Sequence, residues 1–248
     1  LAAYRANLEI MDRSPDGAAP SGARVDLVRN IGSALAFSGR REEGRGMLEE
    51  ALSMARVLEP ADPQREGLLV MDLGIGSSVE GQPELALESY REAARLFELD
   101  PPDASTRFAL EYQTAAALYS LGRLDEAAEA AQAARAVLEA SWSTPQMRAV
   151  MLSSLECNIA SGRGDHERVV VLASDAIDVA QGLSPPLLEA IGQLRSTLSR
   201  SLLETGRAQE AAREAERAHG ALAEAMGAES RQANLALERW VRALLTLG

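Results

Sequence analysis

The sequence is poor in the residues that build most metal and disulfide sites. Its 248 residues include one cysteine and two histidines, and all 25 basic residues are arginine. One cysteine excludes an internal disulfide, and two histidines beside it are too few for an ordinary zinc site. No apolar run reaches the ~18 residues of a membrane span, and no basic-then-apolar signal segment opens the chain. We therefore expect a cytoplasmic protein, and the absence of lysine indicates a GC-rich bacterial genome.

Aromatic residues are scarce as well, at 4%, although 46% of the residues are hydrophobic. The apolar content is mainly Ala, Leu, Val and Met, which suits closely packed helices better than sheets. We find no sustained alternation of apolar and polar residues, so we predict no strand. The formal net charge is -12, which should repel phosphate backbones and anionic lipid surfaces. We expect neither a nucleic acid nor a membrane as a partner.

What the sequence does contain is a glycine at almost constant intervals. Each of these glycines lies in a short polar turn between two Ala- and Leu-rich segments. They are Gly39, Gly81, Gly122, Gly164, Gly206 and Gly248, with spacings of 42, 41, 42, 42 and 42 residues. A fixed period of this size predicts stacked repeats, each of which buries its apolar face against its neighbours.

Each repeat reads as two helices joined at the turn glycine. If that glycine is numbered as the fifteenth residue of its repeat, about 14 residues upstream form the first helix and about 18 downstream form the second. In the first complete repeat these helices are predicted at 23–38 and 42–58. Nine of the ten prolines lie between repeats, where a helix breaker is expected. The tenth, Pro83, lies at the first turn of a second helix, where its missing N–H costs nothing.

The chain is predicted to be one solenoid over residues 1–248. Its parts are a half repeat at 1–20, complete repeats at about 23–60, 67–101, 106–141, 148–183 and 189–226, and a half repeat at 229–248. The last helix would keep several apolar residues partly open. These are Leu237, Trp240, Val241, Leu244 and Leu245. We therefore expect a fragment of a longer protein, or a partner that covers this end.

Small residues within the repeats form a second pattern. Glycine occupies the eighth place as Gly32 and Gly74, and Tyr90 is a large aromatic residue at the twenty-fourth. Alanine occupies the twentieth place (Ala86, Ala127, Ala211) and the twenty-seventh (Ala51, Ala93, Ala134, Ala176, Ala218). This pattern resembles the tetratricopeptide repeat. The sequence departs from it at Gly44 and Val169 in the twentieth place, and at Ala115, Cys157 and Ser199 in the eighth.

The period exceeds the usual ~34 residues of that repeat. A period of about 42 residues with longer helices is similar to the kinesin-light-chain subclass and to the superhelical domains of maltose-activator-type bacterial regulators. The resemblance implies an all-α, right-handed superhelical solenoid of antiparallel helix hairpins. It also implies a concave groove that binds a peptide, a partner helix or a protein.

By the same resemblance, first-helix residues at places 2, 5, 9, 12 and 13 line the groove. The candidate groove-binding residues are Arg29, Phe37, Met71, Ile75, Tyr112, Tyr119, Met151, Asn158, Gln193, Arg200 and Arg242. An apolar and aromatic middle flanked by arginines would suit an amphipathic helix or a peptide with acidic ends. The alternative is that some of these side chains pack against the neighbouring first helix. Family members that grip a terminal carboxylate use Lys and Asn at places 5 and 9. Only Asn158 matches, so that ligand is not expected.

No group of residues indicates catalysis. The segment Gly74-Ile75-Gly76-Ser77-Ser78 resembles a phosphate-binding loop, but it lies within a predicted helix with no strand before it. Cys157 takes a buried packing place, with no His or Lys nearby in sequence to lower its pKa. His166 lies in a turn and His219 on a helix, where surface or capping roles are expected. We predict no enzyme activity, no catalytic residue, no metal site and no cofactor.

The sequence thus favours a protein–protein interaction scaffold or regulatory module within a larger bacterial signalling protein that carries further domains. Its partner would be a protein or peptide held in the groove. The alternative is a small-molecule or signal-peptide sensor domain of a transcriptional regulator or a signalling ATPase.

Overall fold

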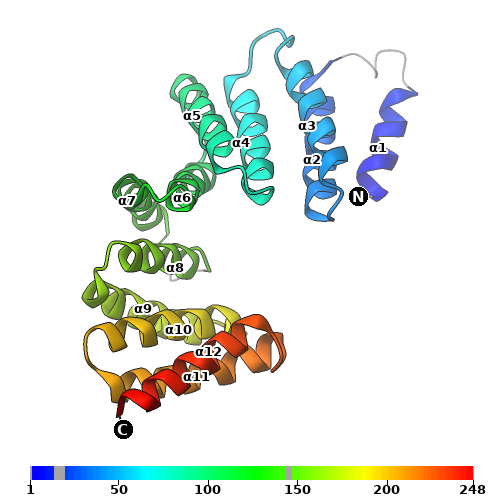
Figure 1. Cartoon of the computed structure of the whole chain (residues 1–248). Coiled ribbons are helices and arrows are strands. Elements are labelled where there is room, and N and C mark those ends of the chain that lie inside the picture. The colour runs from blue at the N-terminus through cyan, green and yellow to red at the C-terminus, as the bar shows by residue number, and fades with distance from the viewer. Residues whose placement is uncertain (1, 14–19, 143–146, 248) are drawn as a thin grey trace. The chain divides into compact units, whose positions relative to one another are not determined.

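The computed structural model describes residues 2–13, 20–142 and 147–247, and within these ranges the chain forms α-helices and no strand (Figure 1). The helices are α1 (Ala2–Asp12), α2 (Gly22–Phe37), α3 (Arg41–Ala55), α4 (Pro63–Val79), α5 (Pro83–Leu99), α6 (Ala104–Ser120), α7 (Leu124–Ser141), α8 (Met147–Gly162), α9 (His166–Gly182), α10 (Leu188–Glu204), α11 (Ala208–Met226) and α12 (Arg231–Leu247). The prediction of an all-α fold is confirmed. Helices α2 and α3 match the predicted spans 23–38 and 42–58, except that α3 ends three residues earlier.

The turn glycines share one backbone conformation. The φ angles are 89° at Gly39, 75° at Gly81, 71° at Gly122, 76° at Gly164 and 77° at Gly206. These values lie in the left-handed region, which glycine adopts without the steric cost that a side chain brings. Gly248, the sixth glycine of the predicted series, lies outside the described residues. The regular glycine spacing therefore marks equivalent turns between paired helices.

Backbone hydrogen bonds close the turns at Gly39, Gly81, Gly164 and Gly206 in the same way. The N–H of the residue after the glycine donates to the carbonyl five residues upstream, as from Arg40 to Leu35 at 3.0 Å and from Gln82 to Ser77 at 2.9 Å. The glycine N–H donates three residues upstream, from Gly39 to Ala36 at 3.2 Å. This pairing is the Schellman motif, which satisfies carbonyls that the end of a helix would otherwise leave free.

The chain divides into two compact units, Leu1–Gly122 and Arg123–Gly248. In the first unit α2 packs on α3 and α4 on α5, and contacts of α3 with α4 and of α5 with α6 join the hairpins. In the second unit α8 packs on α9, α10 on α11 and α12 on α11, and α9 contacts α10. Each unit is therefore a stack of helix hairpins. The predicted single solenoid over 1–248, and its place within a longer protein, stay predictions.

A pair of facing glycines brings α2 and α3 close together. A Cβ atom at Gly44 would lie 2.6 Å from the Gly32 carbonyl oxygen, and one at Gly32 would lie 2.9 Å from the Gly44 carbonyl oxygen. This close approach explains why Gly44 stands where the repeat pattern has alanine. In the next repeat Ala86 is accommodated, and a Cβ at Gly74 would instead lie 2.7 Å from the ring of Tyr90.

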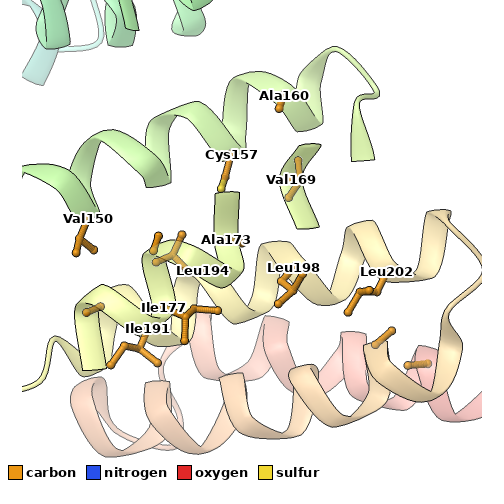
Figure 2. Close-up of a cluster of buried hydrophobic side chains, with 14 of the residues drawn as sticks. Val150, Cys157, Ala160, Val169, Ala173, Ile177, Ile191, Leu194, Leu198 and Leu202 are labelled. Atoms are coloured by element: carbon orange, nitrogen blue, oxygen red, sulfur yellow. The ribbon is translucent and has the colours of Figure 1, made fainter. Parts of the chain in front are cut away.

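The core of the second unit lies between α8, α9 and α10 (Figure 2). Val150 and Cys157 of α8 face Ile177 of α9, and Leu194 and Leu198 of α10 complete the cluster. Cys157 is 1% exposed, which confirms its predicted packing role. Burial raises the pKa of its thiol to about 12, so the reactive thiolate is not formed near neutral pH.

The last helix keeps part of its apolar surface open, as predicted from the sequence. Its buried residues are the alanines Ala233, Ala236 and Ala243. The exposed apolar residues are Leu235, Leu237, Val241, Leu244, Leu245 and Leu247. Trp240 is partly buried and packs against the core of the second unit. The alanines and Trp240 of α12 therefore make its contacts, while its other large apolar residues lie on the surface.

Candidate functional site

The first helices of successive repeats lie side by side within each unit. Helix α4 contacts both α2 and α6 in the first unit, and α10 contacts both α8 and α12 in the second. The predicted groove residues are carried by these helices. In each unit a pocket opens between neighbouring first helices, and we call them the unit-1 pocket and the unit-2 pocket.

The unit-1 pocket is a cavity of about 210 Å³ between α2, α3 and α4. Two predicted groove residues, Phe37 and Ile75, line it together with Leu48, Leu73 and Val79. The Phe37 side chain is 84% exposed. Covering this exposed ring with an apolar group of a partner would remove apolar surface from water, which is favourable. The pocket therefore suits an apolar group.

Two ion pairs lie around the unit-1 pocket, whose lining also includes the exposed Arg41. The Asp72 carboxylate accepts hydrogen bonds from Arg29 Nε at 2.7 Å and from Ser33 Oγ at 3.1 Å. Arg45 of α3 forms an ion pair with Glu80. Arg29, a predicted groove residue, is therefore neutralised by Asp72 and lends the pocket no free positive charge.

The unit-2 pocket is a cavity of about 200 Å³ between α8, α10 and α12, with Leu222 of α11 in its wall. Its lining residues are Ser154, Cys157, Asn158, Gln193, Leu194, Ser196, Thr197, Leu222, Gln232, Leu235 and Arg239. Two of these, Asn158 and Gln193, are predicted groove residues that the structure brings together. Arg239 is the one charged residue of this lining, which contains no carboxylate. The pocket is thus polar and positively charged in an acidic protein.

Arg239 is partly buried, and its Nη1 donates a hydrogen bond to Ser196 Oγ. Its pKa is lowered, chiefly because burial removes water from the cation and next because Arg200 lies near; Glu238 acts in the opposite direction. Arginine nonetheless remains protonated at physiological pH. Sequence reasoning missed Arg239 because it occupies the sixth place of its repeat, outside the five places that the resemblance assigns to the groove.

The remaining predicted groove residues are not gathered in one site. Met71 is 5% exposed and belongs to the core, so it presents little surface to a partner. Tyr112 stacks on Phe108, with ring centroids 6.1 Å apart. Tyr119 and Met151 are 36% and 44% exposed. Tyr112 therefore packs within the first unit, whereas Tyr119 and Met151 are open to solvent.

The predicted arginines near the carboxyl end of the chain are exposed. Arg200 donates from Nη2 to Ser161 Oγ at 2.6 Å, across from α10 to α8. Arg242 lies on α12 and forms no ion pair within the described part of the chain. Arg200 therefore contributes positive charge near the unit-2 pocket while keeping a neutral hydrogen-bond partner.

A larger opening lies between α7, α8 and α9 on the second-helix side, and we call it the charged hollow. Its volume is about 940 Å³. Carboxylates outnumber guanidinium groups in its lining, with Asp125, Glu129, Glu139, Glu156, Asp165 and Asp175 against Arg135, Arg163 and Arg168. Arg135 pairs with Glu156, and Arg163 pairs with Asp125 at 3.1 Å. The hollow is large but has an excess of negative charge.

The histidines take part in structural hydrogen bonds. His166 Nδ1 lies 3.4 Å from Ser201 Oγ, and His219 Nδ1 lies 3.0 Å from the Ala233 carbonyl oxygen. Across the residues that the structure describes, no three His, Cys, Asp or Glu side chains are grouped so as to hold a metal ion. The glycine-rich segment at Gly74 lies inside α4, where its backbone N–H groups are used by the helix. In the same ranges no helix has both the length and the apolar character to cross a bilayer.

Comparison with known proteins identifies the class of fold. No protein-family model matches the sequence, and no curated protein matches it. Solved structures do match. BtubC (BKLC) from P. vanneervenii is 17% identical and has a TM-score of 0.77, with 93% of this chain and 92% of that one covered. The chain therefore has a fold of the tetratricopeptide-repeat type, as the repeat pattern predicts.

Two further structures show the range of proteins with this fold. A Podosopora anserina protein described as a kinesin light chain with nearly identical TPR-like repeats is 17% identical, with a TM-score of 0.65 over 82% of this chain and 97% of that one. A STAND protein with a tetratricopeptide repeat sensor from Pyrococcus horikoshii is 14% identical, with a TM-score of 0.74. That match covers 97% of this chain and 34% of the STAND protein. Folds of this type generally mediate protein–protein interaction.

Proposed function

We propose that the chain is a non-enzymatic interaction module that holds an extended segment of a partner protein against its first helices. The observation that supports this most directly is the position of the two pockets. Each lies where first helices of neighbouring repeats meet, so a bound segment would contact consecutive repeats at once. In the first unit the exposed Phe37 would provide apolar contacts to a bound segment, and in the second unit the amides of Asn158 and Gln193 would provide polar contacts.

The wider setting of this proposal is a bacterial, cytoplasmic signalling protein that carries further domains. The similar STAND protein has a tetratricopeptide repeat sensor, and the match covers 34% of its chain. In that setting the module would select a partner and leave any chemistry to other domains. The proposal assigns the chain no substrate and no cofactor.

The test is affinity capture with matched variants. Phe37→Ala removes the most exposed large ring, and Val171→Ala removes an exposed apolar residue on the second helix α9. We expect a specific partner, identified by mass spectrometry, to lose at least about tenfold in affinity with Phe37→Ala, because exposed aromatic anchors dominate such interfaces. Val171→Ala should leave its affinity within about twofold. Equal retention by both variants would remove the first-helix face from consideration.

A second candidate is a sensor that binds a small molecule or a signal peptide. It is favoured by the match to the STAND protein along almost the whole chain and by the largely apolar surface of the unit-1 pocket. A ligand present at about 100 times its Kd would stabilise the fold by about 2.7 kcal/mol. A thermal-shift screen of metabolites and short peptides measures this directly. A compound whose shift disappears with Ile75→Trp, which fills the pocket, would support the sensor.

A further inference from the structure

One cation in the second unit, Arg239, lacks the ion pair or ring contact that other partly buried arginines have; Glu238 acts on it without forming an ion pair. Partly buried arginines elsewhere in the described chain face a carboxylate, as Arg29 faces Asp72 and Arg195 faces Glu214, or a ring, as Arg148 faces Trp142. Arg239 is the one partly buried guanidinium, among the arginines whose side chains are described, that is paired with neither. A desolvated charge without a counter-ion is unfavourable, so an anion at this position would be stabilised.

In the first unit, Asp72 occupies the repeat position that Arg239 has in the second, so the charges at the two positions can be compared. Asp72 and Arg239 both occupy the sixth place of their repeats, and each bonds to the fifth-place residue 43 positions upstream, Arg29 and Ser196 respectively. The ninth place holds Ser33 in the first case and Arg200 in the second. The first set is neutral, because Arg29 and Asp72 cancel. The second set carries two positive charges and no negative one.

The unit-2 pocket offers donors that match a carboxylate. A guanidinium has five N–H donors, and Ser196 uses one of them, so a bidentate pair remains possible. Ser196 is buried, which holds the guanidinium in place at the wall. The side-chain amides of Asn158 and Gln232 add N–H donors around the same space. Leu194, Leu222 and Leu235 supply apolar walls for the carbon atoms behind the carboxylate.

The size of the pocket limits the ligand to a small group. A cavity of about 150 Å³ holds a benzene molecule, so about 200 Å³ admits an acidic side chain but no folded element. The charged hollow is larger, but two of its three arginines are already paired and carboxylates dominate its lining. An anion would be repelled there and attracted to the unit-2 pocket.

We propose that the unit-2 pocket binds one carboxylate, carried by an Asp or Glu side chain of the partner segment, and that Arg239 is the residue that holds it. This proposal rests on the proposed interaction function for the source of the carboxylate. The carboxylate pairs with the free edge of the guanidinium, while Ser196 fixes the opposite edge. No other part of the partner is specified by this pocket.

The experiment uses three probes on the whole chain. They are the capped peptides acetyl-Ala-Ala-Glu-Ala-Ala-amide and acetyl-Ala-Ala-Gln-Ala-Ala-amide, and the free acid succinate. Each is titrated to about 10 mM, tenfold above a millimolar Kd, while the Arg239 Nε–Hε signal and the backbone amides of α10 and α12 are followed by ¹⁵N NMR. We expect the Glu peptide to shift these signals and the Gln peptide to leave them unchanged.

Two variants and a control locate the effect. Arg239→Gln should weaken binding of the Glu peptide at least about tenfold, because a buried charge pair loses one partner. Ser196→Asp should do the same by placing a carboxylate on Arg239, as Asp72 does for Arg29. Arg231→Gln makes the same charge change at an exposed position of α12 and should alter Kd by less than about twofold. Thermal unfolding of each variant verifies that it is folded.

The outcomes separate this proposal from the interaction function on which it rests. If the Glu peptide binds through Arg239 and succinate does not, both are supported. If succinate binds through Arg239 at least as well, the carboxylate pocket is supported and a partner-borne source is overturned. If no probe shifts the Arg239 signal, or if Arg231→Gln matters as much as Arg239→Gln, the pocket proposal is overturned. The Phe37→Ala capture experiment then still decides the interaction function.

Discussion

The unit-1 and unit-2 pockets both lie between first helices of neighbouring repeats, yet they differ in charge. In the first, Arg29 and Asp72 cancel and the remaining lining is largely apolar. In the second, Arg239 has Ser196 in place of a carboxylate, and the lining includes the side-chain amides of Asn158, Gln193 and Gln232. Repeats with one backbone design can thus present sites of different chemistry. The difference in charge comes from the fifth- and sixth-place side chains, 43 residues apart, and not from the helices that carry them.

The walls of the unit-1 pocket depend on the close approach of α2 and α3. A substitution that forces these helices apart should cause the largest loss of stability. Gly44→Ala would place a Cβ 2.6 Å from the Gly32 carbonyl oxygen, so the free energy of unfolding should fall by about 3 kcal/mol. Gly46→Ala is the matched control, since no atom lies within 4 Å of its Cβ position. It should stabilise the helix by up to about 1 kcal/mol. Urea unfolding followed by circular dichroism measures both, and equal effects would refute the close approach.

Removing the carboxylate of the unit-1 pocket should destabilise the fold. Asp72→Asn leaves Arg29 partly buried without a counter-charge, and Asp72 itself is largely shielded, with 14% of its side chain exposed. We expect the free energy of unfolding to fall by about 2 kcal/mol. Glu43→Gln, at an exposed ion pair, should change it by less than about 0.5 kcal/mol. A loss at Asp72 no greater than that of the control would mean that the pair does not stabilise the fold.

Removing the cation of the unit-2 pocket should raise the free energy of unfolding, whereas removing Asp72 lowers it. Without a bound anion, Arg239→Gln eliminates an uncompensated charge and keeps a group that can donate to Ser196. We expect the free energy of unfolding to rise by up to about 1 kcal/mol. Arg195→Gln, which breaks a partly buried pair with Glu214, should lower it. The same urea experiment tests both, and a loss with Arg239→Gln would show that Arg239 already has a counter-charge.

The smallest effect concerns Cys157, which lines the unit-2 pocket at the eighth place, where the first unit has Gly32. Its thiol pKa is raised from an ordinary 9.0 to about 12 in the folded chain. The folded state therefore binds this proton more tightly, and the associated stability is complete below pH 9 and is lost as the pH rises towards 12. Between pH 8 and pH 10 the wild type should lose about 1 kcal/mol more than Cys157→Ala. At pH 7 the thiol should contribute no pH dependence, and parallel profiles of the two proteins would contradict the shift.

The parts of the fold that depend on local chemistry could be predicted from the sequence. Gly39 and its counterparts mark the turns because only glycine takes a positive φ without strain. The helix spans follow from apolar residues at helical spacing between these turns. Cys157 could be placed in the core because its repeat position faces the second helix.

The candidate site could be predicted only in part, because it depends on which residue a neighbouring repeat supplies. Arg29, Met71 and Tyr112 all occupy the fifth place, yet the first is paired, the second is buried and the third stacks on a ring. The position of a residue within its repeat does not by itself predict which of these three environments it has. Arg239 could have been found by comparing fifth and sixth places 43 residues apart, a pairing that the period alone does not indicate.

The open surroundings of the turn glycines bear on how such proteins diverge. No heavy atom lies within 4 Å of the Cβ position at Gly39, Gly81, Gly122, Gly164 or Gly206. A replacement there meets only the conformational cost of a left-handed residue, about 1 kcal/mol and least for asparagine. The turn glycines could thus be replaced one at a time during evolution. The regular glycine spacing would be lost while the turns keep their conformation. Proteins of the same fold at 14–17% identity are compatible with such tolerance.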